Sequence, residues 1–119
     1  MTDVAINWFE LPVSDLARAS RFYEAVLQTK IDEMPGPDGP MKIFVQDGRP
    51  IGMLDASEQA SSSQNGVIIY FNTADVGAAL ERVTSAGGAV AVPATSIGEH
   101  GAIGQFIDSE GNRVALHCP

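Results

Sequence analysis

Two residues near opposite ends of the chain, Glu10 and His117, form the only acid–base pair that the sequence suggests. A carboxylate and an imidazole that project into one cavity can exchange a proton with a bound molecule. The same side chains can instead form a salt bridge or stand in water at a rim, and the sequence leaves these alternatives open. Glu10 and His117 are therefore candidates for acid–base catalysis without being assigned to it.

Strand alternation groups further residues with this pair. Successive side chains of a strand point to opposite faces of a sheet, so residues two apart share a face. The residues predicted to line one cavity on this face are Trp8, Glu10, Ile68, Tyr70, Asn72, Arg113, Ala115 and His117. An aromatic floor with a few polar groups suits a small organic ligand. In the alternative, Trp8 and Ile68 close the cavity and belong to the core.

Two other reactive side chains carry weaker signals. His100 lies in the glycine-rich stretch 98–101, which we expect to be a loop that either covers the cavity mouth or leaves the imidazole in solvent. Cys118 is the only cysteine, so it forms no disulfide within the chain, and we interpret it as a residue at the end of a strand. Together with a start that lacks a signal-peptide pattern, this favours a cytoplasmic location.

The hydrophobic pattern predicts the elements that position these residues. Ser14 and Asp15 can cap a helix over residues 14–27, and Asp75 can cap a second over 74–86 that ends at Gly87. The expected strands are residues 4–13, 29–34, 41–46, 51–54, 67–73, 89–92, 102–107 and 114–117. Residues 35–40 contain three prolines, which cannot donate to a strand ladder, so we predict a loop there.

The second half of the chain repeats the first with an offset of 60 residues, so that Asp15 matches Asp75 and Ala19 matches Ala79. Each half reads as a β-α-β-β-β unit. Module 1 is expected at about residues 3–57, a serine-rich linker at 58–65 and module 2 at 66–119. We predict an α+β fold of two tandem modules in one domain, whose mixed sheets curve around a shared cavity.

Composition limits the partners. The chain has 119 residues, enough for one core, and its net charge of −8 is unfavourable for binding nucleic acid or an anionic membrane surface. No apolar stretch approaches the roughly 20 residues that cross a bilayer. We therefore expect neither nucleic acid nor membrane as a partner.

Two segments resemble a known superfamily. Residues 11–27 read LPVSDLARASRFYEAVL and residues 106–116 read FIDSEGNRVAL, with Ser109 where proline is common. Both resemble the vicinal oxygen chelate superfamily, which contains glyoxalase I, bleomycin-resistance proteins and extradiol dioxygenases. The resemblance covers nearly the whole chain and implies the glyoxalase/bleomycin-resistance fold. It also implies a homodimer, because short members of the family place paired modules across or beside a dimer interface.

Enzymes of this superfamily hold a divalent metal through four side chains, two from each half. By resemblance, two positions lie seven residues before each helix-capping aspartate, at Trp8 and Ile68. The other two lie four residues after each turn glycine, at Gly52 and Ala115. None of these side chains is a metal donor of the usual kind. We expect no bound metal and no other cofactor.

Three functions remain open. The first is a metal-free protein that binds a small organic molecule, as bleomycin-resistance members do. The second is a lyase or isomerase of the same fold that uses Glu10 or His117 as acid or base. The third is an interaction module without a ligand. A broad apolar cavity lined by Trp8 and Tyr70 favours the first, a Glu10–His117 contact within hydrogen-bond reach the second, and a cavity filled by its own side chains the third.

Overall fold

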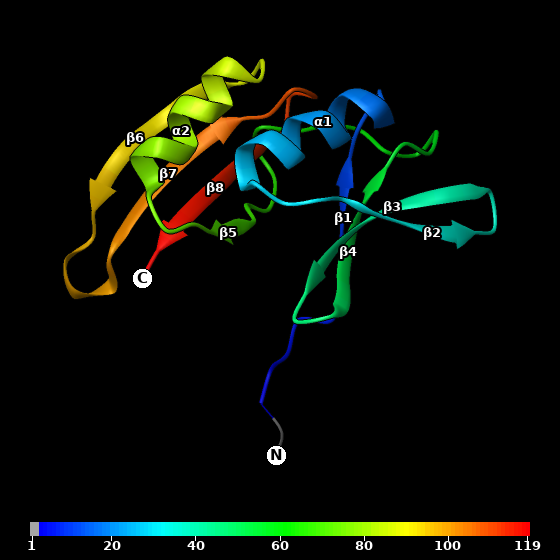
Figure 1. The fold of residues 1–119 in the computed structure, drawn as a ribbon, viewed down its shortest axis with the longest axis horizontal. Coiled ribbons are helices and arrows are strands. Elements are labelled where there is room, and N and C mark those ends of the chain that lie inside the picture. The colour runs from blue at the N-terminus through cyan, green and yellow to red at the C-terminus, as the bar shows by residue number, and fades with distance from the viewer. Residues whose placement is uncertain (1–2) are drawn as a thin grey trace.

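Two four-stranded mixed sheets, each with one α-helix, make up the computed structural model, which describes residues 3–119 (Figure 1). Module 1 contains β1 (Phe9–Pro12), α1 (Leu16–Leu27), β2 (Asp32–Gly36), β3 (Gly39–Gln46) and β4 (Arg49–Asp55). Module 2 contains β5 (Tyr70–Asn72), α2 (Val76–Ser85), β6 (Ala89–Ser96), the 3-10 turn η1 (Gly98–His100), β7 (Ala102–Ile107) and β8 (Arg113–Cys118). Within these residues no helix is both long and apolar enough to cross a membrane.

The two sheets have the same topology, which confirms the predicted α+β fold of two β-α-β-β-β modules. Their strand orders are β1-β4-β3-β2 and β5-β8-β7-β6. In each module the first strand runs parallel to the last, and the remaining pairs are antiparallel. The registers also correspond, because Glu10 lies opposite Met53 in module 1 and Tyr70 lies opposite Ala115 in module 2.

Both helices begin where the sequence places their caps. The Asp15 carboxylate accepts the backbone N–H of Arg18 at 3.0 Å, and Asp75 accepts that of Ala78 at 3.0 Å. Each bond satisfies a backbone donor that has no partner within the helix. At the other end of α2, Gly87 adopts a φ of +102°, a left-handed angle that glycine tolerates.

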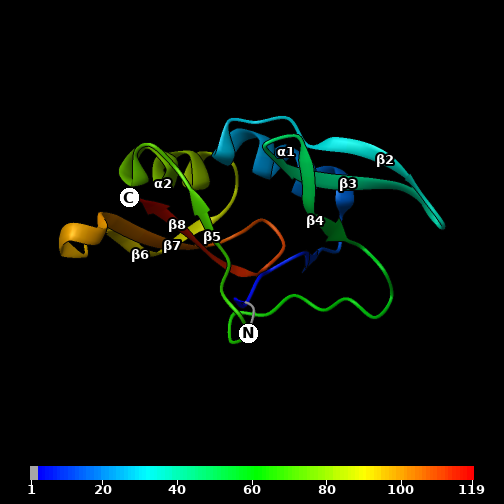
Figure 2. The same ribbon diagram turned by 90° about the horizontal axis from the view of Figure 1, so that it is seen from below.

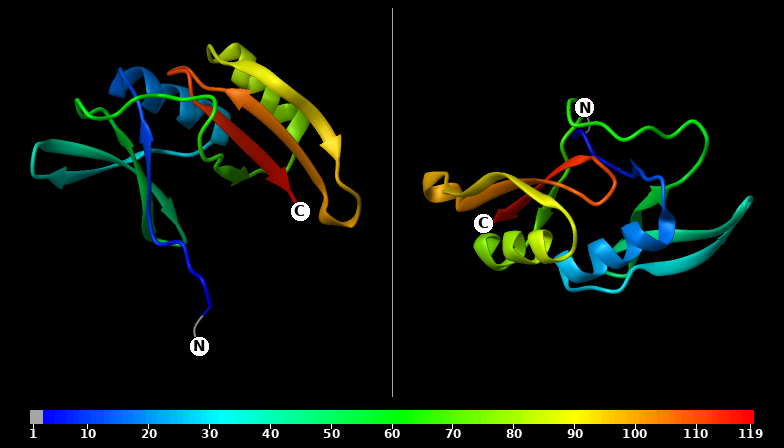
Figure 3. Two further views of the ribbon diagram at one scale, coloured as in Figure 1. Left: turned by 180° about the vertical axis from the view of Figure 1, so that it is seen from behind. Right: turned by 90° about the horizontal axis from the view of Figure 1, so that it is seen from above.

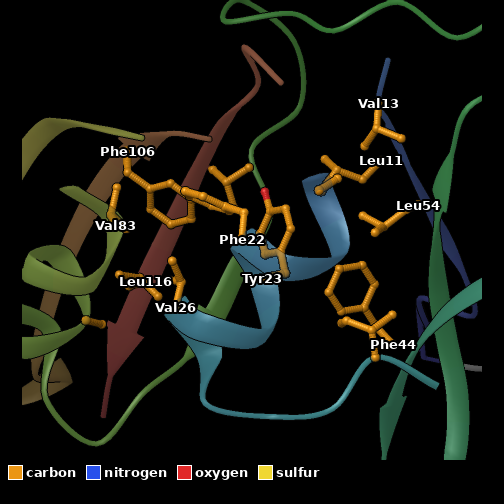
Figure 4. Packing of buried hydrophobic residues seen from close by; sticks show 14 of the residues in the cluster. Leu11, Val13, Phe22, Tyr23, Val26, Phe44, Leu54, Val83, Phe106 and Leu116 are labelled. Carbon is orange, nitrogen blue, oxygen red and sulfur yellow. The ribbon is translucent and has the colours of Figure 1, made fainter. Parts of the chain in front are cut away.

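The helix-facing sides of both sheets share one core around α1. The Tyr23 ring lies 5.6 Å from that of Phe44 in module 1 and 5.9 Å from that of Phe71 in module 2. Figure 4 shows α1 between Leu54 and Phe44 on one side and Phe106 on the other. The modules lie side by side with α1 and α2 in contact (Figures 2 and 3). Because the inner faces meet at α1, the opposite face of each sheet, here called the open face, is turned outward.

The turn between β7 and β8 joins the modules through buried polar groups. The Tyr23 hydroxyl donates to the Asp108 carboxylate at 2.6 Å, and Asn112 Nδ2 donates to the backbone carbonyl of Pro12 at 2.6 Å. Asp108 also accepts the backbone N–H groups of Glu110 and Asn112, which shapes the turn itself. Burial, followed by the nearby Asp108 charge, raises the pKa of Tyr23 well above its ordinary value, so this phenol remains a donor.

Glu110, in the same turn, reaches the start of α1. Its carboxylate accepts the backbone N–H groups of Ser14 and Asp15, both at 2.9 Å, and forms an ion pair with Arg18 at 2.7 Å. Burial alone would raise the pKa of Glu110, but the hydrogen bonds from Arg18, Asp15, Ser109 and Ser14 outweigh it and lower the pKa to about 2. A negative charge at this position also complements the N-terminal end of the α1 dipole.

The prediction of a loop over residues 35–40 is wrong. β2 and β3 continue through this segment, where Pro35 lies opposite Pro40 and Gly36 opposite Gly39, leaving a two-residue turn. In an antiparallel pair only alternate residue pairs exchange backbone hydrogen bonds. Two prolines that face each other at a non-hydrogen-bonded pair therefore cost the ladder no donor. Gly39 supplies the positive φ of +118° at the end of the turn.

The first predicted strand is shorter than expected. Only Phe9–Pro12 pairs within a sheet, and residues 3–8 form an extended arm without strand partners. Figure 1 shows this arm projecting away from both sheets. Val4 and Ile6 in the arm are 98% and 86% exposed. The apolar alternation of Val4, Ile6 and Trp8 has the period of a half-buried strand, but residues 3–119 leave Val4 and Ile6 almost fully exposed, whereas Trp8 is 37% exposed.

The lowered pKa of Glu110 predicts how stability changes with pH. The carboxyl titrates at about 2 in the folded chain, against an ordinary value of 4.5. Its contribution is therefore fully present above about pH 4.5 and is lost as the pH falls toward 2. The difference corresponds to a free energy of unfolding on the order of 3 kcal/mol. We expect Glu110→Gln to lose most of this contribution at pH 7 and to show a flatter pH dependence below 4.5.

Urea unfolding at several pH values measures this effect. Glu58→Gln is the matched control, because Glu58 is exposed and lies in the segment between the modules. Parallel stability curves for wild type and Glu110→Gln between pH 4.5 and 2 would contradict the assigned role of Glu110.

Candidate functional site

A row of polar side chains crosses the open face of module 2. Tyr70 on β5, Ala115 on β8 and Gln105 on β7 are directly opposite one another in the register, and Arg113 lies two residues before Ala115 on β8. Arg113 Nη1 donates to Gln105 Oε1 at 3.0 Å, and Gln105 Nε2 donates to the Tyr70 hydroxyl at 3.3 Å. Three strands of this sheet thus supply one continuous hydrogen-bonded chain.

The open face of module 1 carries an aromatic and an acidic residue at corresponding positions. Trp8 Nε1 donates to Glu10 Oε2 at 3.3 Å. Glu10 occupies the place in module 1 that Tyr70 occupies in module 2, since the two are 60 residues apart and pair with the last strand of their own sheets. Each open face therefore offers one hydrogen-bonding group at the same position on its first strand.

The other predicted site residues lie on β5, on β8 or just before β5. Ile68 and His117 are half-buried, Asn72 is exposed opposite His117, and Ala115 is fully buried. His117 Nε2 lies 2.7 Å from the backbone carbonyl oxygen of His100, so the imidazole ties β8 to η1. Cys118, half-buried at the end of β8, lies 3.3 Å from the carbonyl oxygen of Ala74.

Glu10 and His117 have separate partners. Glu10 is bonded to Trp8 and His117 to the backbone of His100, and no hydrogen bond or ion pair within residues 3–119 joins the two. Glu10 instead shares a cavity of about 270 Å³ with Arg113, and Pro12, Ser61, Ser63 and Val67 also line it. The segment between the modules closes one side of this cavity, where Gln64 accepts a hydrogen bond from Arg113 Nε at 3.2 Å.

Sequence reasoning missed Gln105, although a signal for it was present. Residues 103, 105 and 107 alternate with the core residues Gly104 and Phe106, which places Gln105 on the same face as Ala115. The hydrogen bond between Gln105 and Tyr70 had no such signal, because it depends on β8 lying between their strands.

A sequence profile of the Glyoxalase/Bleomycin resistance protein/Dioxygenase superfamily matches residues 5–116. The chain belongs to this superfamily.

Individual relatives agree with this assignment. A glyoxylase-like domain-containing protein of Didymella fabae is 30% identical over 118 residues, which cover 93% of this chain and 91% of that protein. CFP32 of Mycobacterium tuberculosis is 27% identical over 116 residues, but the match spans 92% of this chain and only 44% of CFP32. The solved structure of TnmS3, an antibiotic binding protein from Streptomyces sp. CB03234, is similar with a TM-score of 0.70 and 27% identity, covering 100% of this chain and 98% of that one.

The metal site that the superfamily implies does not fit the side chains of this member. One predicted position needs correction, because Gly52 lies on the helix-facing side, where a Cβ would come within 2.4 Å of the Phe9 ring. Its open-face neighbour Met53 is the true counterpart of Ala115. The positions are then Trp8, Met53, Ile68 and Ala115, which offer no imidazole or carboxylate. Within residues 3–119, no group of three or more His, Cys, Asp or Glu side chains is placed to hold a metal ion.

The contact between His117 and η1 leads to a prediction about what holds the η1 loop in place. Because the acceptor is the backbone oxygen of His100, His117→Ala should release η1, whereas His100→Ala should not. We expect the amides of Ile97 and Gly101, which are bonded within the loop, to exchange about 5-fold faster in His117→Ala, as the loss of one hydrogen bond implies. Amide hydrogen exchange measured by NMR provides the readout. Equal exchange rates in the two variants would contradict this role of His117.

Proposed function

We propose that this chain binds a small organic molecule against its open faces without the superfamily's metal. The observation that carries the proposal is the composition of these faces: Trp8 and Tyr70 remain on the surface beside oriented polar groups, whereas the other aromatic side chains pack around α1. Aromatic surface with a few fixed polar groups is typical of sites for small ligands. The similarity to TnmS3, which is described as an antibiotic binding protein, also supports this function.

We further propose that the chain acts as a homodimer. The cytoplasm remains its expected location. The open faces point away from the shared core, so a second copy is needed to enclose a ligand between two of them. The arm supports this assembly, because residues 4–9 carry no charge in a chain of net charge −8. Val67, which precedes β5, is a further apolar side chain that is 92% exposed. Covering such side chains is favourable by about 25 cal/mol per Å².

Neither alternative function has an observation of its own in its favour. The acid–base hypothesis needed contact between Glu10 and His117, and each has another partner. The hypothesis of a ligand-free module needed a face filled by its own side chains, whereas Tyr70 is 47% exposed. We therefore build no proposal of catalysis on Glu10 or His117.

Ligand binding and metal independence can be tested together. Trp8 is the only tryptophan, so a ligand on the open face of module 1 should change its fluorescence. We expect aromatic antibiotics, with bleomycin as the first tested, to bind equally well with and without EDTA. Trp8→Leu should weaken binding about 10-fold, measured by thermal shift, because an aromatic contact is lost. One metal ion per chain in elemental analysis, lost together with stability on chelation, would contradict metal-free binding.

The homodimer predicts a measurable effect of the arm. Sedimentation at tens of micromolar, a rough concentration above the dissociation constants of stable dimers, should show a dimer for wild type. We expect Val4→Asp combined with Ile6→Asp to shift it to monomer, since charges would then enter an apolar interface. Gln46→Asp combined with Gln59→Asp adds the same two charges at exposed positions and should remain dimeric. A wild-type monomer under these conditions would overturn the assembly.

A further inference from the structure

The hydrogen-bonded row Arg113–Gln105–Tyr70, here called the polar tier, has a definite direction. Arginine carries only donors, so the Gln105 atom that faces Arg113 at 3.0 Å must be the carbonyl oxygen. The amide nitrogen of Gln105 consequently faces Tyr70, at 3.3 Å. The Tyr70 oxygen then accepts a hydrogen bond, and its own O–H proton is left to donate elsewhere.

Ala115 makes this arrangement possible. It lies on β8 between Tyr70 on β5 and Gln105 on β7, and adjacent strands are about 4.8 Å apart. Gln105 must therefore reach across a whole strand to meet Tyr70. The methyl group of Ala115 is small enough to lie beneath the hydrogen bond, which agrees with its complete burial on a face that is otherwise open.

The charge of Arg113 reinforces the direction of the tier. No carboxylate within residues 3–119 lies within 4.0 Å of its guanidinium, whose recorded partners are Gln105 and the Gln64 backbone. Glu10 lines the same cavity, but its recorded partner is Trp8. A cation at the start of the tier polarises the Gln105 amide and, through it, the Tyr70 hydroxyl, which strengthens that hydroxyl as a donor.

We propose that the polar tier makes Tyr70 a dedicated hydrogen-bond donor, and that the ligand of this site is an aromatic compound that presents an acceptor oxygen, such as a ketone, quinone or carboxylate, to it. The inference rests on the proposed ligand-binding function and adds the chemical class of the ligand. An aromatic ligand that presents only a donor at this position leaves the Tyr70 proton without a partner and is bound more weakly.

A pair of naphthalene probes that differ in their polar substituent tests the proposal. 2-Acetylnaphthalene offers a carbonyl acceptor, and 2-aminonaphthalene, uncharged at pH 7, offers mainly N–H donors. Equilibrium dialysis should show the wild-type protein binding the ketone about 5- to 10-fold more tightly than the amine, as expected for one hydrogen bond.

Gln105→Glu reverses the tier with little change in size. Its carboxylate accepts from Arg113 and also from the Tyr70 hydroxyl, which turns the phenolic proton inward and leaves an oxygen lone pair facing the ligand. The preference should then favour the amine. Tyr70→Phe removes the donor and should bind both probes with similar affinity. Gln46→Glu, an equal charge change at an exposed residue at the end of β3, is the matched control and should keep the wild-type preference.

The outcomes separate the tier from the proposed function. Equal binding of the two probes by wild type, or an unchanged preference in Gln105→Glu, overturns the tier while ligand binding stands. Binding of neither probe overturns the proposed binding function and the tier with it. If Gln105→Glu does not fold, as judged by circular dichroism, Tyr70→Phe decides: loss of the ketone preference supports the tier and its retention overturns it.

Discussion

The carboxylates of the turn between β7 and β8 hold the rest of the structure in place. Asp108 and Glu110 belong to module 2, yet they bind Tyr23 in the middle of α1 and the backbone at its start. Buried carboxylates are tolerated only where donors surround them. The turn itself and Tyr23 supply the donors to Asp108, and Arg18 with the two residues before α1 supplies most of those to Glu110. Because Glu110 is bonded to the N-terminus of the helix and Asp108 to one of its side chains, both the position and the rotation of α1 are fixed against module 2. Removing Asp108 leaves the buried Tyr23 hydroxyl without this acceptor, and removing Glu110 takes the acceptor from the backbone N–H groups at the start of α1.

The geometry of the site follows from that attachment. With α1 held between the two sheets, the inner faces must share a core, and Tyr23, Phe44 and Phe71 fill it. The open faces then turn outward, carrying Trp8 and Tyr70 into solvent. Aromatic side chains on the inner faces of the sheets thus build the core, whereas Trp8 and Tyr70 on the opposite side stay partly exposed.

The residues at equivalent positions of β4 and β8 influence which polar groups each open face presents. In module 2, Ala115 lets a hydrogen bond pass over β8, so that groups on β7 and β5 act together. In module 1 the equivalent position holds Met53, and Glu10 is instead hydrogen-bonded by Trp8, the last residue of the arm before β1. Two modules with one topology therefore present unlike groups, a carboxylate on one face and a phenol hydroxyl on the other. The four positions at which the superfamily holds its metal offer no imidazole or carboxylate.

Local patterns were sufficient to predict most elements of this protein. Helix caps, helical spacing and strand alternation depend only on neighbours a few residues away, as at Asp15 and Asp75. Because the second half repeats the first, each element predicted in one module was also predicted in the other. The same alternation identified the face that carries Trp8 and Tyr70. Contacts between distant residues had no such signal: the bond of Glu110 to Arg18 across 92 residues and that of His117 to the backbone of His100 depend on how strands and modules meet. Periodicity states which side of an element a residue occupies, but only packing in three dimensions decides which residue it finds there.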